Sequence, residues 1–297
     1  MGTSASSPGP GPNVPLVPRW VPPVPQPADQ PAPTPQAEPD APSPPRSPNA
    51  PPVPAVPLPP PLPPGQSPEV PLAPARRFLG ASVSLGRFAR TGSQDDLRRG
   101  LGRYVRNGLT GSTSGARRMG ATARTAGALY NTLSALQTGR ATRADLGVDP
   151  ASLSGCTAKE VMDVIVEAIR PIDGTQDAEA NRQSIAIATA DLLVEFPNAD
   201  ITALAPEQID FLIERYVAHD LCQRVELDVG RKIETGAPDA ATVVRRLEEM
   251  KDFVVAEVHS VFQARRDNGE RLQRDHVAEL VSATLQEIFR VFEEYLQ

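Results

Sequence analysis

The glycine at position 2 is the residue whose place in this chain gives it the clearest chemistry. Removal of Met1 is expected before a residue as small as Gly2, so the mature chain presents an unhindered glycine amine. We therefore take Gly2 as a candidate modification site that another protein handles. The leader MGTSAS also fits the N-myristoylation pattern, but a single acyl chain anchors weakly and no polybasic segment supports it.

A cluster of arginines is the second candidate site. Eleven arginines fall within the 49 residues from 76 to 124. Arginine recognises carboxylates and phosphates through planar, bidentate hydrogen bonds. We predict partner or nucleic-acid binding at Arg98, Arg99, Arg103, Arg106, Arg117, Arg118 and Arg124.

Aromatic residues lie among these arginines and offer rings that can stack on bases. They are Phe78, Phe88, Tyr104 and Tyr130. The other interpretation is that the arginines pair with acidic residues of the same chain or of a partner protein. We favour this pairing and keep nucleic-acid contact as the alternative.

The histidines and cysteines favour neither a metal site nor a catalytic one. His219, His259 and His276 lack metal-ligand spacing, and we expect structural or surface roles for them. Cys222 follows His219 by three positions, but structural zinc sites need four ligands. Cys156 precedes an expected helix start, where a thiol pKa can fall, yet we favour a small helix-entry residue.

No motif in the sequence argues for an enzyme. It has no phosphate-binding loop and no nucleophile elbow. We predict no catalytic residue, no metal and no cofactor. Two widely spaced cysteines, no signal peptide and no bilayer-spanning apolar run fit a cytoplasmic protein without a membrane partner.

Proline and charge divide the chain into three parts. Of its 34 prolines, 29 lie in residues 1–75, and we predict a disordered Pro-rich arm there because proline fixes φ and removes a backbone donor. Residues 76–150 hold 13 Arg and no Lys against four Asp, and we predict a basic Arg/Gly-rich helical segment. Residues 151–297 hold 15 Lys and Arg against 28 Asp and Glu, and we predict an acidic all-helical domain.

Apolar periodicity predicts an all-α fold, with a bundle of about five helices in residues 151–297. A capping box at Thr157–Glu160 begins the first of them, and Asn268-Gly269 separates the last two, which we expect to form an antiparallel hairpin. The expected helices are 157–170, 176–196, 206–232, 238–266 and 270 to near the end. In the basic segment we expect two helices, over 93–107 and 116–136, and we expect no strand.

Two stretches together resemble the QatB family of the bacterial Qat anti-phage defence system. The first is MGTSASSPGPGPNVPLVPRWVPP at residues 1–23. The second is residues 76–133, where RYVRNG and GARRMG carry the likeness. Neither stretch is a catalytic signature.

This resemblance implies a setting of four components: an ATPase, a QueC-like enzyme, a TatD-like nuclease and this chain. QueC-like relatives in bacterial immunity can attach a deazaguanine to a protein's N-terminal glycine. Carried over, the resemblance makes Gly2 the acceptor, with Thr3 and Ser4 read by the modifying enzyme.

The sequence thus leads to a non-enzymatic adaptor or substrate subunit of an anti-phage system. The alternative is a nucleic-acid-binding subunit that uses the Arg-rich segment 76–143. A third interpretation is a scaffold that presents polyproline II segments to partner grooves.

Overall fold

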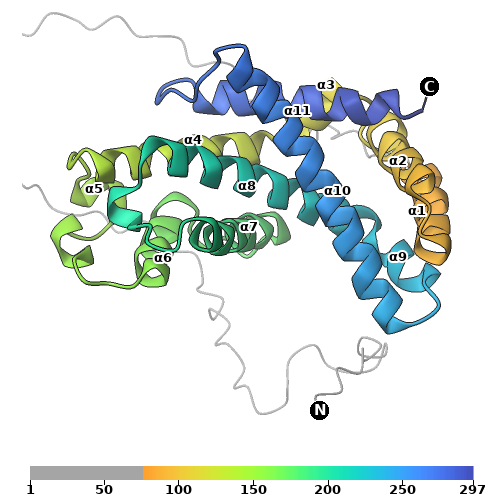
Figure 1. Ribbon diagram of the computed structural model, residues 1–297, viewed down its shortest axis with the longest axis horizontal. Coiled ribbons are helices and arrows are strands. Elements are labelled where there is room, and N and C mark those ends of the chain that lie inside the picture. The colour runs from red at the N-terminus through yellow and green to blue at the C-terminus, as the bar shows by residue number, and fades with distance from the viewer. Residues whose placement is uncertain (1–75, 297) are drawn as a thin grey trace, which may run out of the picture. The chain divides into compact units, whose positions relative to one another are not determined.

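The computed structural model describes residues 76–296, and the predicted disordered arm over 1–75 lies outside them. Every regular element in the described range is helical (Figure 1), which confirms the predicted all-α class. The first α-helices are α1 (Leu79–Thr91), α2 (Gln94–Arg103), α3 (Ser112–Arg118), α4 (Gly120–Gln137) and α5 (Arg143–Leu146). The later ones are α6 (Ala158–Ile169), α7 (Gln176–Glu195), α8 (Pro206–Val225), α9 (Arg231–Gly236), α10 (Ala240–Asp267) and α11 (Val277–Glu294).

Side-chain caps fix two helix starts where the sequence predicts them. At α2, the Ser93 hydroxyl accepts a hydrogen bond from the Asp96 backbone N–H at 3.4 Å. At α6, Thr157 and Glu160 form the expected capping box, in which the Thr157 N–H donates to the Glu160 carboxylate at 2.8 Å. Such caps satisfy backbone groups that the first helical turn leaves unpaired, and each is worth about 1 kcal/mol.

The basic segment forms more helices than the two expected. The sequence does not predict α1, because Ser, Gly and Arg interrupt its apolar stripe, yet Leu85 and Phe88 on it are fully buried. The helix expected over 93–107 is present as α2, extended by a π-helical turn over Tyr104–Gly108. The helix expected over 116–136 is divided at Met119 into α3 and α4.

In residues 151–297 the helices follow the predicted ranges, with differences at their ends. α8 ends at Val225, and a π-helical turn over Glu226–Gly230 leads into the short α9, where one helix to 232 was expected. α10 ends at the predicted break, and Gly269 takes a φ of +82°. α11 begins at Val277 instead of 270, and it forms an open hairpin with α10 whose arms diverge towards the start of α10 (Figure 1).

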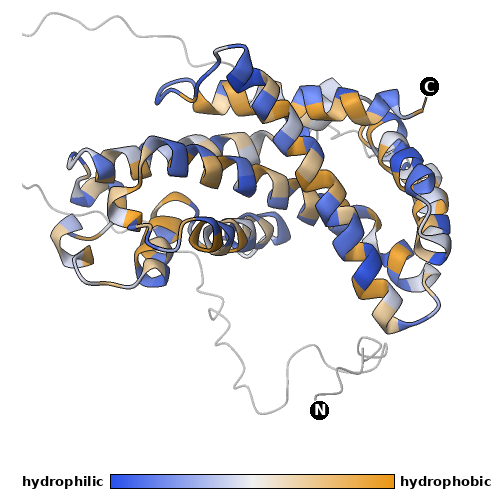
Figure 2. Ribbon diagram, in the orientation of Figure 1, coloured by the Kyte–Doolittle hydropathy of each residue, from blue (hydrophilic) through white to orange (hydrophobic). Residues whose placement is uncertain are grey.

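One hydrophobic core joins helices from both halves of the described chain. Its members extend from Ala81 in α1 to Phe292 in α11, and apolar residues gather where helices face one another (Figure 2). α8 packs against α4, α7 and α10, while α11 packs against α2, α3 and α4. The core therefore crosses residue 150, where the charge of the sequence changes sign.

Two glycines on α2 let α1 and α11 approach that helix closely. The sequence suggests that Gly100 and Gly102 weaken α2. In the structure, a Cβ on Gly100 would lie 2.7 Å from the Leu85 side chain, and one on Gly102 would lie 2.7 Å from the Phe292 carbonyl oxygen. Both glycines are therefore needed for packing, against α1 and α11 respectively.

We predict that Gly102→Ala lowers the free energy of unfolding by about 1–3 kcal/mol, because a backbone carbonyl must move to admit the methyl group. Gly120→Ala in α4 is the matched control, since its Cβ would meet its nearest neighbour at an ordinary 3.5 Å. Urea unfolding followed by circular dichroism measures both variants. Equal stability of the two variants would contradict the packing role of Gly102.

Candidate interaction surface

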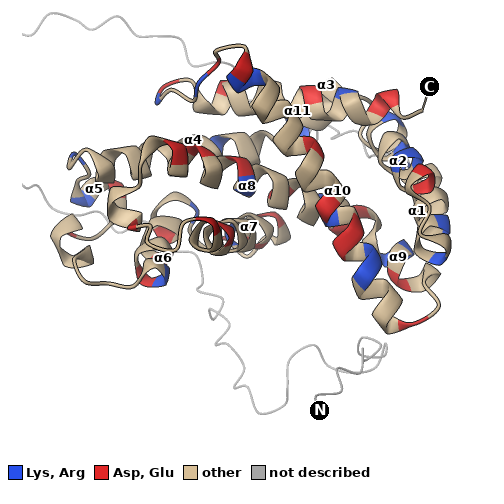
Figure 3. Cartoon of the chain, viewed as in Figure 1, with Lys and Arg blue, Asp and Glu red and all other residues tan. Residues whose placement is uncertain are grey.

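The seven predicted arginines lie on four elements that follow one another in the chain. Arg98, Arg99 and Arg103 are on α2, and Arg106 is in the π-helical turn that follows it. The other three, Arg117, Arg118 and Arg124, are at the end of α3 and on α4. Basic residues, coloured blue, recur along α1 and α2 in Figure 3.

Three of these arginines have contacts within the chain. The Arg103 guanidinium donates to the Ser84 hydroxyl at 2.8 Å and so ties α2 to α1. The Arg118 guanidinium forms an ion pair with Asp228 at 3.0 Å. The Arg98 guanidinium lies over an aromatic ring of α10, 5.7 Å from the Phe253 centroid.

The other four arginines are exposed to solvent. Among residues 76–296, no ion pair or side-chain hydrogen bond holds any of them. They are Arg99, Arg106, Arg117 and Arg124. These four, rather than all seven, are the arginines that the fold leaves available to a partner.

The aromatic residues of the basic segment are used in packing, so the expectation that they stack on bases is wrong for most of them. Phe88 and Tyr104 are buried in the core. Phe78 stacks on Tyr104, with ring centroids 5.4 Å apart. The Tyr130 hydroxyl donates to the Leu272 carbonyl oxygen at 3.1 Å.

Asp228 connects the basic segment to the acidic helices. It accepts a hydrogen bond from the Tyr104 hydroxyl at 2.9 Å as well as one from Arg118 at 3.0 Å. Burial, assisted by the neighbouring Asp228 charge, raises the pKa of Tyr104, so the phenol stays protonated and remains a donor. This is one instance of the expected pairing between the arginines and acidic residues of the same chain.

A second polar cluster lies inside the core, and the sequence analysis did not find it. The fully buried Asp220 carboxylate accepts hydrogen bonds from the Thr122 hydroxyl and, at 2.6 Å, from the Asn181 side-chain amide. Arg224 lies one turn along α8, 3.6 Å from Asp220, and forms an ion pair with Asp177 at 3.0 Å. The cluster holds α4, α7 and α8 together. The one feature of the sequence that could have indicated it is the four-residue spacing of Asp220 and Arg224, which places both on one face of a helix.

Each histidine has a carboxylate neighbour. His219 lies 2.7 Å from Asp191, His259 lies 2.6 Å from Glu214, and exposed His276 lies 3.3 Å from Glu279. Within residues 76–296, no three side chains of the metal-ligating types are grouped to hold an ion.

The two cysteines differ in their surroundings. Cys156 is exposed, and Cys222 is buried. Burial raises the pKa of Cys222 to about 12, so its thiol stays protonated at neutral pH.

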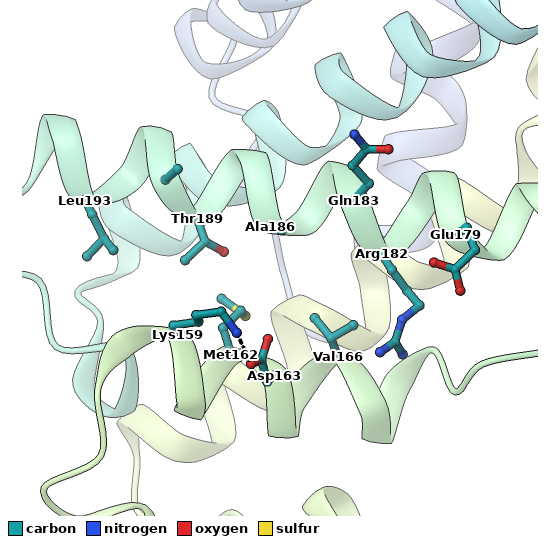
Figure 4. Close-up of a pocket in the computed structure, with 11 residues that line it drawn as sticks. Lys159, Met162, Asp163, Val166, Glu179, Arg182, Gln183, Ala186, Thr189 and Leu193 are labelled. Carbon is teal, nitrogen blue, oxygen red and sulfur yellow. Dashed lines mark hydrogen bonds and ion pairs between the residues drawn. The ribbon is translucent and has the colours of Figure 1, made fainter. Parts of the chain in front are cut away.

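An apolar groove of about 640 Å³ lies between α6 and α7 (Figure 4). Met162 and Val166 of α6 point towards α7, and Leu193 of α7 points towards α6 at one end of the groove. The ion pair of Lys159 and Asp163, 2.6 Å long, lies along one side. The groove offers a partner an apolar floor with charged groups at its margin.

Each helix in the described range is too short or too polar to cross a bilayer.

Comparison with known families matches residues 110–292 to the family described as Qat anti-phage system associated protein QatB. The matched range begins just before α3 and ends within α11, and it covers more than half of the chain. Searches of curated proteins and of solved structures found no match.

We predict that Asp220→Ala lowers the free energy of unfolding by about 3–5 kcal/mol, because it leaves the buried Arg224 and Asn181 without their shared partner. Asp177→Ala is the matched control: it removes the other carboxylate bound to Arg224, but that side chain is 60 % exposed. We expect the control to change stability by about 1 kcal/mol or less. Denaturant unfolding compares them, and a small loss in Asp220→Ala would show that the buried cluster does not hold the helices together.

Proposed function

We propose that this chain, which belongs to the QatB family of Qat anti-phage system proteins, is the non-enzymatic adaptor and substrate subunit of that defence system. Its helical body docks the other components, and its Pro-rich arm presents the N-terminus to a modifying enzyme. Membership of the family makes the chain a component of an anti-phage system. The adaptor role, the named partners and the modification are our proposal.

The observation that carries the adaptor role is the combination of a continuous core with an open apolar groove. The core joins α1 to α11 in one body, and the Arg118–Asp228 ion pair fastens the basic segment to it. The groove between α6 and α7 exposes Ala186 and Ala190 of α7, while its apolar floor on α6 is buried. An accessible apolar surface rimmed by charge is typical of a protein-binding site.

The modification proposed for the arm is conjugation at Gly2. The QueC-like enzyme would use the Gly2 amine as acceptor and read Thr3 and Ser4 beside it, and the ATPase and the TatD-like nuclease would act in the same assembly. Each proline removes a backbone donor and restricts φ, so the composition of the arm suits the role of a tether that enters another protein's site.

Deletion of residues 3–75 with Gly2 retained tests the division of labour between arm and body. We expect the deleted chain to copurify with its partners through the helical body and to carry no added mass at Gly2. Ala190→Glu in the groove is the complementary variant, for which we expect lost copurification with the fold retained, because Ala190 is exposed. A deleted chain that is still modified as efficiently as the full chain would contradict the role of the arm.

A nucleic-acid-binding function for residues 76–143 is the second candidate. It is favoured by the four exposed arginines at 99, 106, 117 and 124. The burial of Phe88 and Tyr104 counts against it, because single-strand binding relies on accessible aromatic rings.

The salt dependence of binding to RNA or DNA distinguishes this second function from the adaptor role. If the four arginines bind phosphates, replacing them with alanine weakens binding to RNA or DNA and reduces the slope of log affinity against log salt by about 1 for each contact. The control replaces four exposed arginines elsewhere, Arg245, Arg271, Arg274 and Arg290. Fluorescence anisotropy measures both. We expect no difference between the two variants, and a loss confined to the first would favour the nucleic-acid function.

A further inference from the structure

A polar cleft of about 300 Å³ lies where α7 and α10 flank α8. We refer to it as the α7–α8–α10 cleft. Each helix brings charged or titratable residues to it, with valines and Phe211 between them. These residues are Asp191, Glu195, Arg215, His219, Lys251 and Asp252.

His219 contributes a buried nitrogen that lacks a partner. Its side chain is 3 % exposed, and its Nε2 atom lies 2.7 Å from the Asp191 carboxylate. The Nδ1 atom on the other side of the ring is buried and makes no hydrogen bond within residues 76–296. A buried polar atom without a partner costs about 1–3 kcal/mol, so this one indicates a group that binds in the cleft.

The two cations of the cleft also lack carboxylate partners. Arg215 lies over the Phe211 ring, 4.9 Å from its centroid, and its Nε atom is buried without a hydrogen-bond partner in the described residues. Lys251 is half-buried, and within residues 76–296 neither it nor Arg215 takes part in an ion pair. Two cations from different helices thus line a small cleft without carboxylate partners.

The carboxylates of the cleft are placed where they oppose an anion least. Asp191 already accepts the hydrogen bond of His219. Glu195 and Asp252 are exposed, so water screens their charges. The cleft thus holds two cations without ion-pair partners, and its two unpaired carboxylates are exposed to water.

We propose that the α7–α8–α10 cleft binds a phosphate group, carried by a small molecule or as inorganic phosphate, through Arg215, Lys251 and His219. Arginine and lysine are the side chains that usually bind phosphate oxygens, and Arg215 offers its unpaired Nε–H. His219 donates through Nδ1–H when doubly protonated, while Nε2–H continues to donate to Asp191. A volume near 300 Å³ suits a small ligand and leaves little room for a polymer.

Phosphate binding should change the protonation of His219 in a defined direction. In the unliganded chain, burial lowers the pKa of His219 against the opposing effect of Asp191, and the charges of Lys251 and Arg215 lower it further. A bound anion favours the imidazolium, so the pKa of His219 rises on binding. The groups that face His219 are Asp191 and Glu195 from α7, Arg215 from α8, and Lys251 and Asp252 from α10.

The experiment titrates the full chain with inorganic phosphate at constant ionic strength, replacing sodium chloride, and follows the His219 ring resonances by NMR. We expect saturable shifts and a raised pKa for His219, with His259 and His276 as internal controls. Ribose 5-phosphate is the second probe. Tighter binding of ribose 5-phosphate identifies a phosphorylated small molecule, and equal binding identifies the phosphate group itself.

Variants that each remove one positive charge test which residues bind the phosphate. Arg215→Gln and Lys251→Gln should each weaken phosphate binding about tenfold or more, which corresponds to about 1.4 kcal/mol. Arg245→Gln is the control, because Arg245 lies on α10 outside the cleft with a side chain that is 61 % exposed. If Arg215→Gln does not fold, the phosphate affinity of Lys251→Gln and the His219 resonances of the unaltered chain test the proposal. Unchanged His219 resonances at millimolar phosphate, or equal weakening by Arg245→Gln, would overturn the proposal.

Discussion

The carboxylate of Asp220 has to be satisfied inside the core, and the arrangement of the central helices depends on that requirement. Its partners come from three helices: Thr122 on α4, Asn181 on α7 and Arg224 on α8. A buried carboxylate without such partners would cost several kcal/mol, so these helices are held at one spacing and one rotation. The apolar core around the cluster stabilises the fold, while the cluster selects which faces of α4, α7 and α8 meet.

The same arrangement creates the surfaces on which function is proposed. Because α8 lies between α7 and α10, it forms the floor of the α7–α8–α10 cleft. Because α7 turns one face towards α8, its other side forms the groove with α6. The basic segment is fixed by Asp228 to the turn after α8. The proposed partner docking and the proposed ligand binding therefore belong to different helix pairs of one compact unit, while the proposed modification belongs to the arm.

The sequence predicts well the features of this fold that depend on neighbouring residues. It predicts poorly those that depend on contacts between residues far apart in the chain. The caps at Ser93 and Thr157 and the break at Asn268 depend on neighbouring residues, and the structure confirms them. α1 is missed because Ser, Gly and Arg interrupt its apolar stripe, and the face that it buries is set by contacts with α2 and α9. The pairing of Arg118 with Asp228 joins residues 110 positions apart, which no local pattern encodes. Family membership is confirmed over 110–292, whereas the motifs that suggest it lie mostly before residue 110.

If this QatB-family chain acts through its N-terminal glycine, as we propose, the mass of its N-terminal peptide reveals the modification. The chain is produced with the complete set of its system's components and, separately, with the QueC-like enzyme inactivated. Our account predicts a Gly2 peptide carrying the mass of a deazaguanine in the first preparation and a free glycine amine in the second. A free Gly2 amine in the presence of the active enzyme would contradict it.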